Sequence, residues 1–272
     1  MSVRAPERET QLSRDTGRPR RPESATVEVA GLSKSFQTGT GPLEALRAVT
    51  FSVRSGETLG IVGRSGCGKS TLLEVICGLE AASCGEVTVH GHQGDRLDRC
   101  VLMPQRDLLL PWRSALDNAA LAPQFQGASQ AEARARALSL FARFGLEEFA
   151  RAQPSELSGG MRQRVAFART LLADKPVLLL DEPFASLDSI TRAELQEWLA
   201  GALAAEPRTT LLVTHDIEEA LFVCDRVLVM SRRPGTVRAE IAGARDRTAP
   251  RTEVVTSPRF SELRQRALEA LA

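Results

Sequence analysis

Short apolar runs alternate with segments of helical periodicity along most of the chain. Runs in which apolar residues are continuous, or alternate with polar ones, are typical of strands. The run at 177–180 is apolar throughout, as expected of a strand that a parallel sheet buries on both faces. The pattern predicts strands at residues 26–30, 50–53, 59–62, 86–89, 101–103, 177–180, 210–213 and 226–230.

Segments with apolar residues at three- and four-residue spacings predict helices between these strands. In the segment 130–144, Leu138, Phe141 and Phe144 share one predicted face, which we expect to pack within a small helical subdomain. Alternation of strands and helices predicts an α/β fold with a mainly parallel core sheet. Helices are expected at residues 114–121, 130–144, 161–173, 190–204 and 217–223.

The two ends of the chain have other patterns. Residues 1–25 are rich in Arg, Glu, Pro and Ser with few apolar positions, which predicts a disordered tail. Residues 246–272 form a C-terminal extension, in which Phe260, Leu263, Leu268 and Leu271 predict an amphipathic helix. We expect this helix to dock onto the domain, and binding to a partner protein is the alternative.

Composition narrows the class of protein. The 272 residues are 43% hydrophobic and 25% charged, as in soluble globular proteins. The net charge of +1 does not indicate the basic surface that is typical of nucleic-acid-binding proteins. The sequence has no apolar run long enough to span a membrane and no hydrophobic leader, which predicts a cytosolic chain. Its five cysteines are an odd number without a C-x-x-C pair, which argues against a disulfide framework and a zinc site.

The stretch LGIVGRSGCGKSTLLEVI, residues 59–76, carries the strongest chemical signal. It places a G-x-x-x-x-G-K-[ST] pattern between a predicted strand and a helix, which is the setting of a phosphate-binding P-loop. Glycines bring backbone N–H groups against phosphate, Lys69 is expected to reach the β- and γ-phosphates, and Ser70 to ligate Mg²⁺. A Gly-rich turn without a ligand is the alternative. The expected ATP contacts are Gly63, Arg64, Ser65, Gly66, Cys67, Gly68, Lys69, Ser70 and Thr71.

Cys67 lies inside this loop, close to a helix N-terminus and to Lys69. Both features lower the pKa of a thiol. We therefore expect alkylating agents to inactivate the protein through Cys67, and ATP to protect it.

Two carboxylates end the apolar strand at 177–180. Ligands of open α/β sheets bind at the carboxyl ends of strands, so Asp181 is expected to hold Mg²⁺ and Glu182 to orient or deprotonate the attacking water. A strand that ends in a solvated acidic turn is the alternative. Together with the P-loop, this pair predicts a P-loop NTPase.

A second anion-binding nest is expected at Ser158, Gly159 and Gly160, at the start of a predicted helix. One P-loop and one separate nest are two halves of a site. This predicts a head-to-tail pair, in which the nest of each subunit closes over the ATP of the other.

The segments LSGG, GRSGCGKS, LLLDEP, SLD at 186–188 and THD at 214–216 together resemble the ATP-binding cassette (ABC) transporter ATPases, over about residues 26–245. The resemblance implies a P-loop NTPase fold with an antiparallel β-subdomain and an inserted helical subdomain at about residues 106–162. It also implies that Phe36 stacks on adenine, where the family often has Tyr. Met161 stands where Gln is frequent in LSGGQ.

Further roles follow from the same resemblance. Gln105 is expected to link Mg²⁺ and water to a membrane partner, and Ser158 and Gly160 to contact the opposing γ-phosphate. Asp188 is similar to the dimer-loop aspartate. His215 is similar to the switch histidine, and its place after the predicted strand 210–213 puts it at the same sheet edge as Asp181. A packing or surface role is the alternative for this histidine.

The segment MPQRDLLLPW at 103–112 resembles that of nitrate, sulfonate and taurine importer ATPases. Residues 108–112 are an apolar patch that suits a groove for a helix of another protein, and packing within the helical subdomain is the alternative. The sequence thus predicts an ATP- and Mg²⁺-dependent importer ATPase, a dimer on the cytoplasmic face of the inner membrane. Its expected partners are permease subunits and, indirectly, an external solute-binding protein. A soluble ABC ATPase that acts as a mechanical module is the main alternative, and a small-molecule kinase is a third.

Overall fold

The computed structural model describes residues 25–39, 41–94, 96–185, 187–205, 207–246 and 249–272. Of the tail predicted at residues 1–25, only Ala25 lies within these ranges, and it begins strand β1 (Ala25–Thr38). Among the helices that the structure describes, none is both long and apolar enough to cross a membrane.

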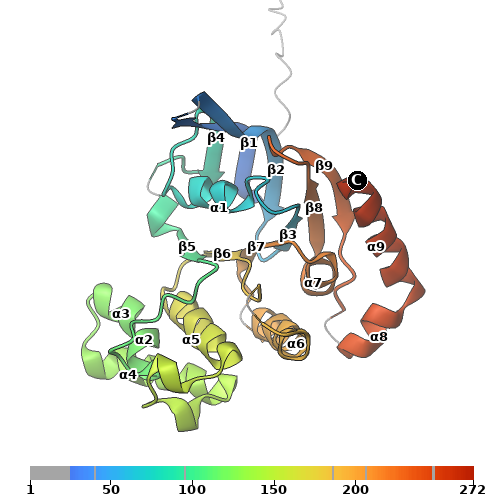
Figure 1. Ribbon diagram of the computed structural model, residues 1–272. Coiled ribbons are helices and arrows are strands. Elements are labelled where there is room, and N and C mark those ends of the chain that lie inside the picture. The colour runs from blue at the N-terminus through green and yellow to red at the C-terminus, as the bar shows by residue number, and fades with distance from the viewer. Residues whose placement is uncertain (1–24, 40, 95, 186, 206, 247–248) are drawn as a thin grey trace, which may run out of the picture.

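A six-stranded sheet forms the centre of the fold (Figure 1). Neighbouring strands from β5 through β8 are parallel, and the edge strand β9 is antiparallel to β8. The predicted mainly parallel core sheet is therefore confirmed. Strand β9 was missed by the sequence analysis, although its apolar residues alternate with Arg238 and Glu240 as in an edge strand. In spatial order the strands are β5 (Cys100–Met103), β6 (Val177–Asp181), β7 (Thr209–Thr214), β3 (Thr58–Val62), β8 (Arg226–Met230) and β9 (Val237–Ala242).

The core lies on both faces of this sheet. In β6, Val177 and Leu179 join the apolar cluster that contains helix α1 (Lys69–Cys77), while Leu178 and Leu180 join the cluster on the opposite face. Side chains alternate across a strand, so a strand buried on both faces needs an unbroken apolar run. This explains why the sequence pattern of β6 indicated a strand so clearly.

A second, antiparallel sheet packs near α1, in the order β2 (Gly41–Arg54), β1 and β4 (Cys84–Val89). β1 and β2 are each 14 residues long, so the predicted strands 26–30 and 50–53 were too short. The residues of β1 and β2 that the prediction left out pair along the same hairpin, for example Phe36 with Leu43. The polar residues there gave no strong strand pattern, and the pairing partner determines the structure instead.

The helical subdomain lies beyond the β5 side of the sheet (Figure 1). The helix expected at 114–121 is two short helices that meet at Ala120. Phe141 and Phe144 are buried as predicted, whereas Leu138 is 46% exposed, so its predicted place on the packed face was wrong. The helices of this subdomain are α2 (Ala115–Ala119), α3 (Leu121–Phe125), α4 (Gln130–Phe144), η2 (Glu147–Phe149), η3 (Pro154–Glu156) and α5 (Gly159–Leu172). The short helix η1 (Arg96–Asp98) precedes β5 in the chain.

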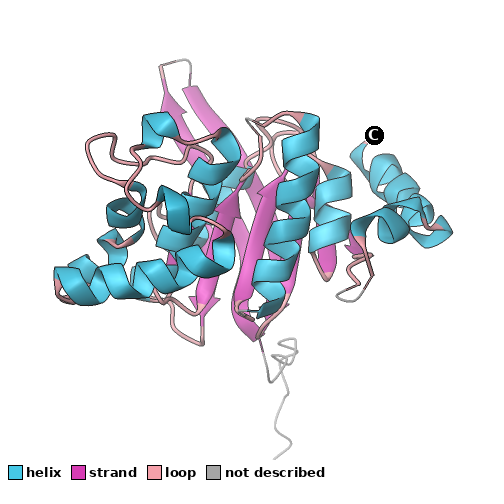
Figure 2. Ribbon diagram, turned by 90° about the horizontal axis from the view of Figure 1, so that it is seen from below, coloured by secondary structure: helices cyan, strands magenta, loops and turns pink. Residues whose placement is uncertain are grey.

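The remaining helices lie across the strands and at the β9 edge, as Figure 2 shows from below. In the C-terminal extension, Phe260 and Leu263 are buried and Arg264 pairs with Glu218 at 3.0 Å. The predicted docking of this helix is confirmed, although Leu268 is 45% exposed. These helices are α6 (Ser189–Ala205), α7 (Ile217–Val223), α8 (Arg251–Thr256) and α9 (Pro258–Leu271).

Candidate functional site

The phosphate-binding loop connects β3 to α1. Gly66 and Gly68 have φ angles of +76° and +104°, in the region that favours glycine, and Gly68 is the N-cap of α1. A Cβ at Gly63 would lie 2.7 Å from Cys67 Sγ, and one at Gly68 would lie 2.8 Å from the Ala45 carbonyl oxygen. The sequence needs glycine at these positions, because the loop turns tightly and packs closely before the helix begins.

Lys69 lies at the centre of this loop. Its side chain is buried, and its Nζ donates to the Gly63 carbonyl oxygen at 2.8 Å and lies 3.5 Å from Glu182 Oε1. The loop therefore holds one compact positive charge beside the N-terminus of α1, where anions are favoured. Ser70 and Thr71 follow in the first turn of the same helix.

Asp181 ends β6 beside this helix. It is 8% exposed, and its Oδ1 is buried without a hydrogen-bond partner in the part of the chain that the structure describes. Burial raises the pKa of this carboxyl, and a hydrogen bond with Ser70 opposes that shift. Carboxylate, hydroxyl and amide oxygens are ligands that Mg²⁺ prefers. Asp181 and Ser70 offer such oxygens, and Gln105, whose side chain is exposed, follows the neighbouring strand β5.

Glu182 lies between Lys69 and His215. Its Oε2 is 3.0 Å from His215 Nδ1, while its Oε1 faces the lysine ammonium. The residue has a φ of +43°, and its N–H donates to the Val213 carbonyl oxygen at 2.8 Å, which fixes the end of β6 to β7. Such a conformation costs energy in a non-glycine residue and is common at functional sites. The structure thus brings together Lys69, Asp181, Glu182 and His215, as the strand-end argument expected.

The LSGG segment lies in a different part of the molecule. Ser158 is the N-cap of α5 and accepts from the Met161 N–H at 3.2 Å. A Cβ at Gly160 would lie 3.2 Å from Thr191 of α6, and one at Gly159 would lie 2.8 Å from Leu187. Within the described residues, the structure gives no contact between this helix start and the phosphate-binding loop, and Figure 1 shows α5 and α1 apart. The two predicted halves of the site are separate within one chain.

Two other predicted site residues lie on elements other than the phosphate-binding loop and β6. Phe36 is on β1 and is half-buried, with Lys34 Nζ 4.7 Å from the centre of its ring. Asp188 is exposed, and its Oδ1 accepts the N–H groups of Ile190 and Thr191 at 3.1 and 3.0 Å. These bonds lower the pKa of Asp188. The aspartate therefore caps the start of α6, a local role that the sequence analysis missed.

Cys67 does not have the expected environment. Its side chain is 2% exposed, and burial raises the pKa of the thiol, although Lys69 and Arg233 oppose the shift. The predicted fall in the thiol pKa was wrong, because desolvation outweighs the nearby positive charges. The thiol packs against Gly63 within the loop.

A network that the sequence analysis missed holds the segment after Gln105. The Asp107 carboxylate accepts from Arg162 Nε at 3.2 Å, and Arg169 donates to the carbonyl oxygens of Asp107 and Leu108 at 2.5 and 2.8 Å. Asn118 donates to the Leu110 carbonyl oxygen and accepts the Leu110 N–H. These partners lie 8 to 62 residues away along the chain, so no local sequence pattern signals them.

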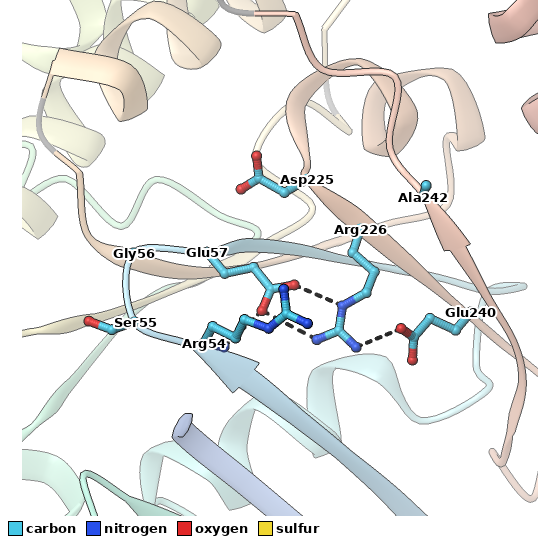
Figure 3. Close-up of a pocket in the computed structure, with 8 residues that line it drawn as sticks. All are labelled: Arg54, Ser55, Gly56, Glu57, Asp225, Arg226, Glu240 and Ala242. Atoms are coloured by element: carbon cyan, nitrogen blue, oxygen red, sulfur yellow. Dashed lines mark hydrogen bonds and ion pairs between the residues drawn. The ribbon is translucent and has the colours of Figure 1, made fainter. Parts of the chain in front are cut away.

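A cavity of about 450 Å³ lies at the opposite end of β3 (Figure 3). Arg226 crosses the cavity between Glu57 at 2.8 Å and Glu240 at 2.9 Å. The positive charge of Arg226 is therefore paired with carboxylates of the protein. Ligands of parallel sheets bind at the carboxyl ends of the strands, and this cavity adjoins the start of β3. The cavity is therefore separate from the Lys69 site.

The chain is similar to known proteins. The family model described as ABC transporter matches residues 46–185. The Taurine import ATP-binding protein TauB of Rhizobium johnstonii is 44% identical over 82% of this chain and 87% of that protein, and the Nitrate import ATP-binding protein NrtD of Synechococcus elongatus is 42% identical over 88% and 89%. The dimeric, post-hydrolysis structure of the ATP-binding cassette MJ0796 with ADP and Pi matches with a TM-score of 0.70 and 33% identity, over 79% of this chain and 98% of that one. The chain therefore belongs to the ABC transporter family, as an ATP-binding protein of the importer type.

Proposed function

We propose that this chain is the ATP-hydrolysing subunit of an importer for a small anionic solute, an aliphatic sulfonate, taurine or nitrate. The position of Glu182 supports the proposed ATP hydrolysis, because its two carboxylate oxygens face Lys69 and His215 at 3.5 and 3.0 Å. A carboxylate next to a phosphate-binding lysine can orient a water for attack on a terminal phosphate.

The roles of the chain's own groups follow from this geometry. The loop N–H groups and Lys69 bind the phosphates and neutralise charge that develops during transfer. Glu182 accepts a proton from the attacking water, and His215 fixes the orientation of the Glu182 carboxylate through their hydrogen bond. Phe36 supplies an aromatic face for adenine.

Asp181, Ser70 and Gln105 are the residues that would hold Mg²⁺. The buried, unpaired Oδ1 of Asp181 supports this assignment, because a buried carboxylate oxygen without a partner is costly. Mg²⁺ would supply charge neutralisation at the phosphates. The three residues would hold it by their oxygen atoms, which are the donors that this ion prefers.

A second copy of the chain completes the site in this proposal. The phosphate-binding loop at Gly63–Thr71 and the Ser158 nest lie apart within one chain, so each needs a partner to face a nucleotide from both sides. Two copies in head-to-tail arrangement place Ser158, Gly159 and Gly160 of each over the nucleotide of the other. The dimeric MJ0796 structures are a precedent for pairing.

The permease is proposed to bind at residues 108–112. Leu108 is 59% exposed and Trp112 is 73% exposed, whereas Leu109 between them is buried and anchors the segment. Exposed apolar side chains on a fixed backbone suit a groove for a helix of another protein. The segment begins three residues after Gln105, so a movement at the nucleotide can reach it through a short, hydrogen-bonded stretch of chain.

These proposals place the subunit peripherally, on the cytoplasmic face of the membrane, with a solute-binding protein acting on the other side. The relatives named after taurine and nitrate support a small solute that carries a sulfonate group or is nitrate itself. The test captures the tagged chain from membranes and measures cellular uptake of taurine, an alkanesulfonate and nitrate, with Lys69→Ala as the inactive variant. A hydrophobic membrane protein should copurify, and uptake of one anion should fail in the variant. Capture without a membrane protein, and unchanged uptake of all three anions, would favour a soluble mechanical ATPase.

A further inference from the structure

The turn between β8 and β9 lies against the phosphate-binding loop. A cavity of about 380 Å³ is lined by both segments, with Arg64, Gly66 and Cys67 on one side and Arg232 and Arg233 on the other. The two segments are 167 residues apart in sequence at their hydrogen-bonded contact. The turn was not among the predicted site residues.

One side chain of the turn bonds directly to the loop. Arg233 Nε donates to the Gly66 carbonyl oxygen at 3.0 Å. The N–H of the same peptide group belongs to Cys67, and it donates to the Arg64 carbonyl oxygen at 3.2 Å. Because a peptide unit is planar, bonds at both its carbonyl and its N–H fix its orientation. Gly66 has a φ of +76°, so the backbone is in the left-handed region at the residue just before this peptide bond.

The turn itself is well fixed. The Ser231 hydroxyl accepts from the Thr236 N–H at 2.9 Å, and the Ser231 N–H donates to the Thr236 carbonyl oxygen at 2.9 Å. Gly235 donates to Ala45 at 2.9 Å and accepts from Arg47 at 3.0 Å, which attaches the turn to β2. The guanidinium therefore extends from a rigid support.

Backbone packing adds a second contact. A Cβ at Gly235 would lie 2.3 Å from the Cys67 carbonyl oxygen, so the turn and the loop touch backbone to backbone. The turn thus meets two successive carbonyl groups of the loop, those of Gly66 and Cys67. A loop held in this way needs less ordering when it binds phosphate, and preorganisation of this kind increases affinity.

We propose that Arg233 is a positioning residue for nucleotide binding, which fixes the orientation of the Gly66–Cys67 peptide in the phosphate-binding loop. It acts through the loop backbone and does not take part in phosphate transfer. The proposal rests on the assignment of this loop as the nucleotide site.

The chain offers a matched control. Arg232 lines the same cavity and carries the same charge, but among the described residues its side chain has no hydrogen bond to the loop. Arg233→Met and Arg232→Met each remove one positive charge and keep an unbranched apolar stem. Only the first removes the bond to Gly66.

The experiment measures the dissociation constant of the purified full chain for MgADP by calorimetry, and KM and kcat for ATP hydrolysis. Arg233→Met should weaken MgADP binding and raise KM by about three- to tenfold, as expected for the net contribution of one hydrogen bond, with kcat within about twofold of wild type. Arg232→Met should leave both constants within about twofold.

Arg233→Lys retains charge and a donor without the fixed planar fork, so it should fall between wild type and Arg233→Met. It also keeps the test decisive if the methionine variant does not fold. Equal effects of the two methionine substitutions would show that charge alone matters and would overturn the proposal. Wild-type affinity in Arg233→Met, or in Arg233→Lys if only that variant folds, would also overturn it. If the wild-type chain does not bind MgADP at all, the assignment of the nucleotide site is instead refuted.

Discussion

Asp107 and Arg162 join the segment after Gln105 to the LSGG segment within one chain. Their side chains meet at 3.2 Å, and Arg162 also donates to the Leu157 carbonyl oxygen at 2.7 Å. Asp107 lies two residues after Gln105, and Arg162 follows the LSGG segment by two residues. A change at the end of β5 therefore has a direct connection to the Ser158 nest, which the proposed dimer would place over the nucleotide of the other subunit.

The first prediction concerns this pair. Both side chains are about one-third exposed, at 30% and 36%, so we expect a modest coupling energy of about 0.5–1 kcal/mol. Urea unfolding of Asp107→Asn, Arg162→Met and the double variant measures it as a double-mutant cycle. Additive effects of the two substitutions would show that the pair contributes no stability.

The second prediction concerns Glu182. Glu182→Gln removes the base but keeps the side-chain size, so hydrolysis should fall by about 10²- to 10⁴-fold while ATP binding persists. The chain should then accumulate as an ATP-bound dimer in size-exclusion chromatography. A chain that stays monomeric with saturating ATP would contradict the head-to-tail arrangement. Lys69→Ala, which removes the phosphate-binding ammonium, is the control that should not form the dimer.

The sequence predicted those parts of the molecule in which a local pattern determines the structure. The unbroken apolar run of β6 and the glycine spacing of the phosphate-binding loop fall in this class. The environment of Cys67 is not determined by a local pattern, because its burial depends on packing around Gly63 after the loop has closed. Arg233 was missed for a similar reason, since its partner Gly66 is distant in sequence.

The third prediction replaces the earlier expectation for Cys67. Burial and a raised pKa leave little exposed thiolate at neutral pH, so iodoacetamide should label this residue slowly. Cys84 is exposed, and it should react about tenfold faster or more. Peptide mass spectrometry at several reaction times compares the two rates. Faster labelling of Cys67 would show that the loop opens readily in solution.

The fourth prediction concerns permease binding. Trp112→Ala should weaken capture of the permease by about 1–2 kcal/mol and reduce transport, because it removes an exposed aromatic contact. The affinity for ATP should stay unchanged. Phe125→Ala is a matched control, since this ring is 88% exposed in the same helical subdomain but outside residues 108–112. Equal losses of permease capture in both variants would contradict a specific role of Trp112.

The fifth prediction concerns Glu219, which is 3% exposed in α7. Burial and the nearby Asp216 raise its pKa to about 8, while Thr214 and Arg192 oppose the shift, and its Oε1 has no partner among the described residues. The folded chain thus binds a proton that the unfolded chain releases near its ordinary pKa of 4.5, so this group's contribution to the free energy of unfolding should fall between about pH 4.5 and 8 and level off above. Glu219→Gln is neutral at every pH and should flatten this decline in urea unfolding. The exposed Glu262→Gln is the control, and a decline of the same slope in Glu219→Gln and wild type would contradict the protonated state of Glu219.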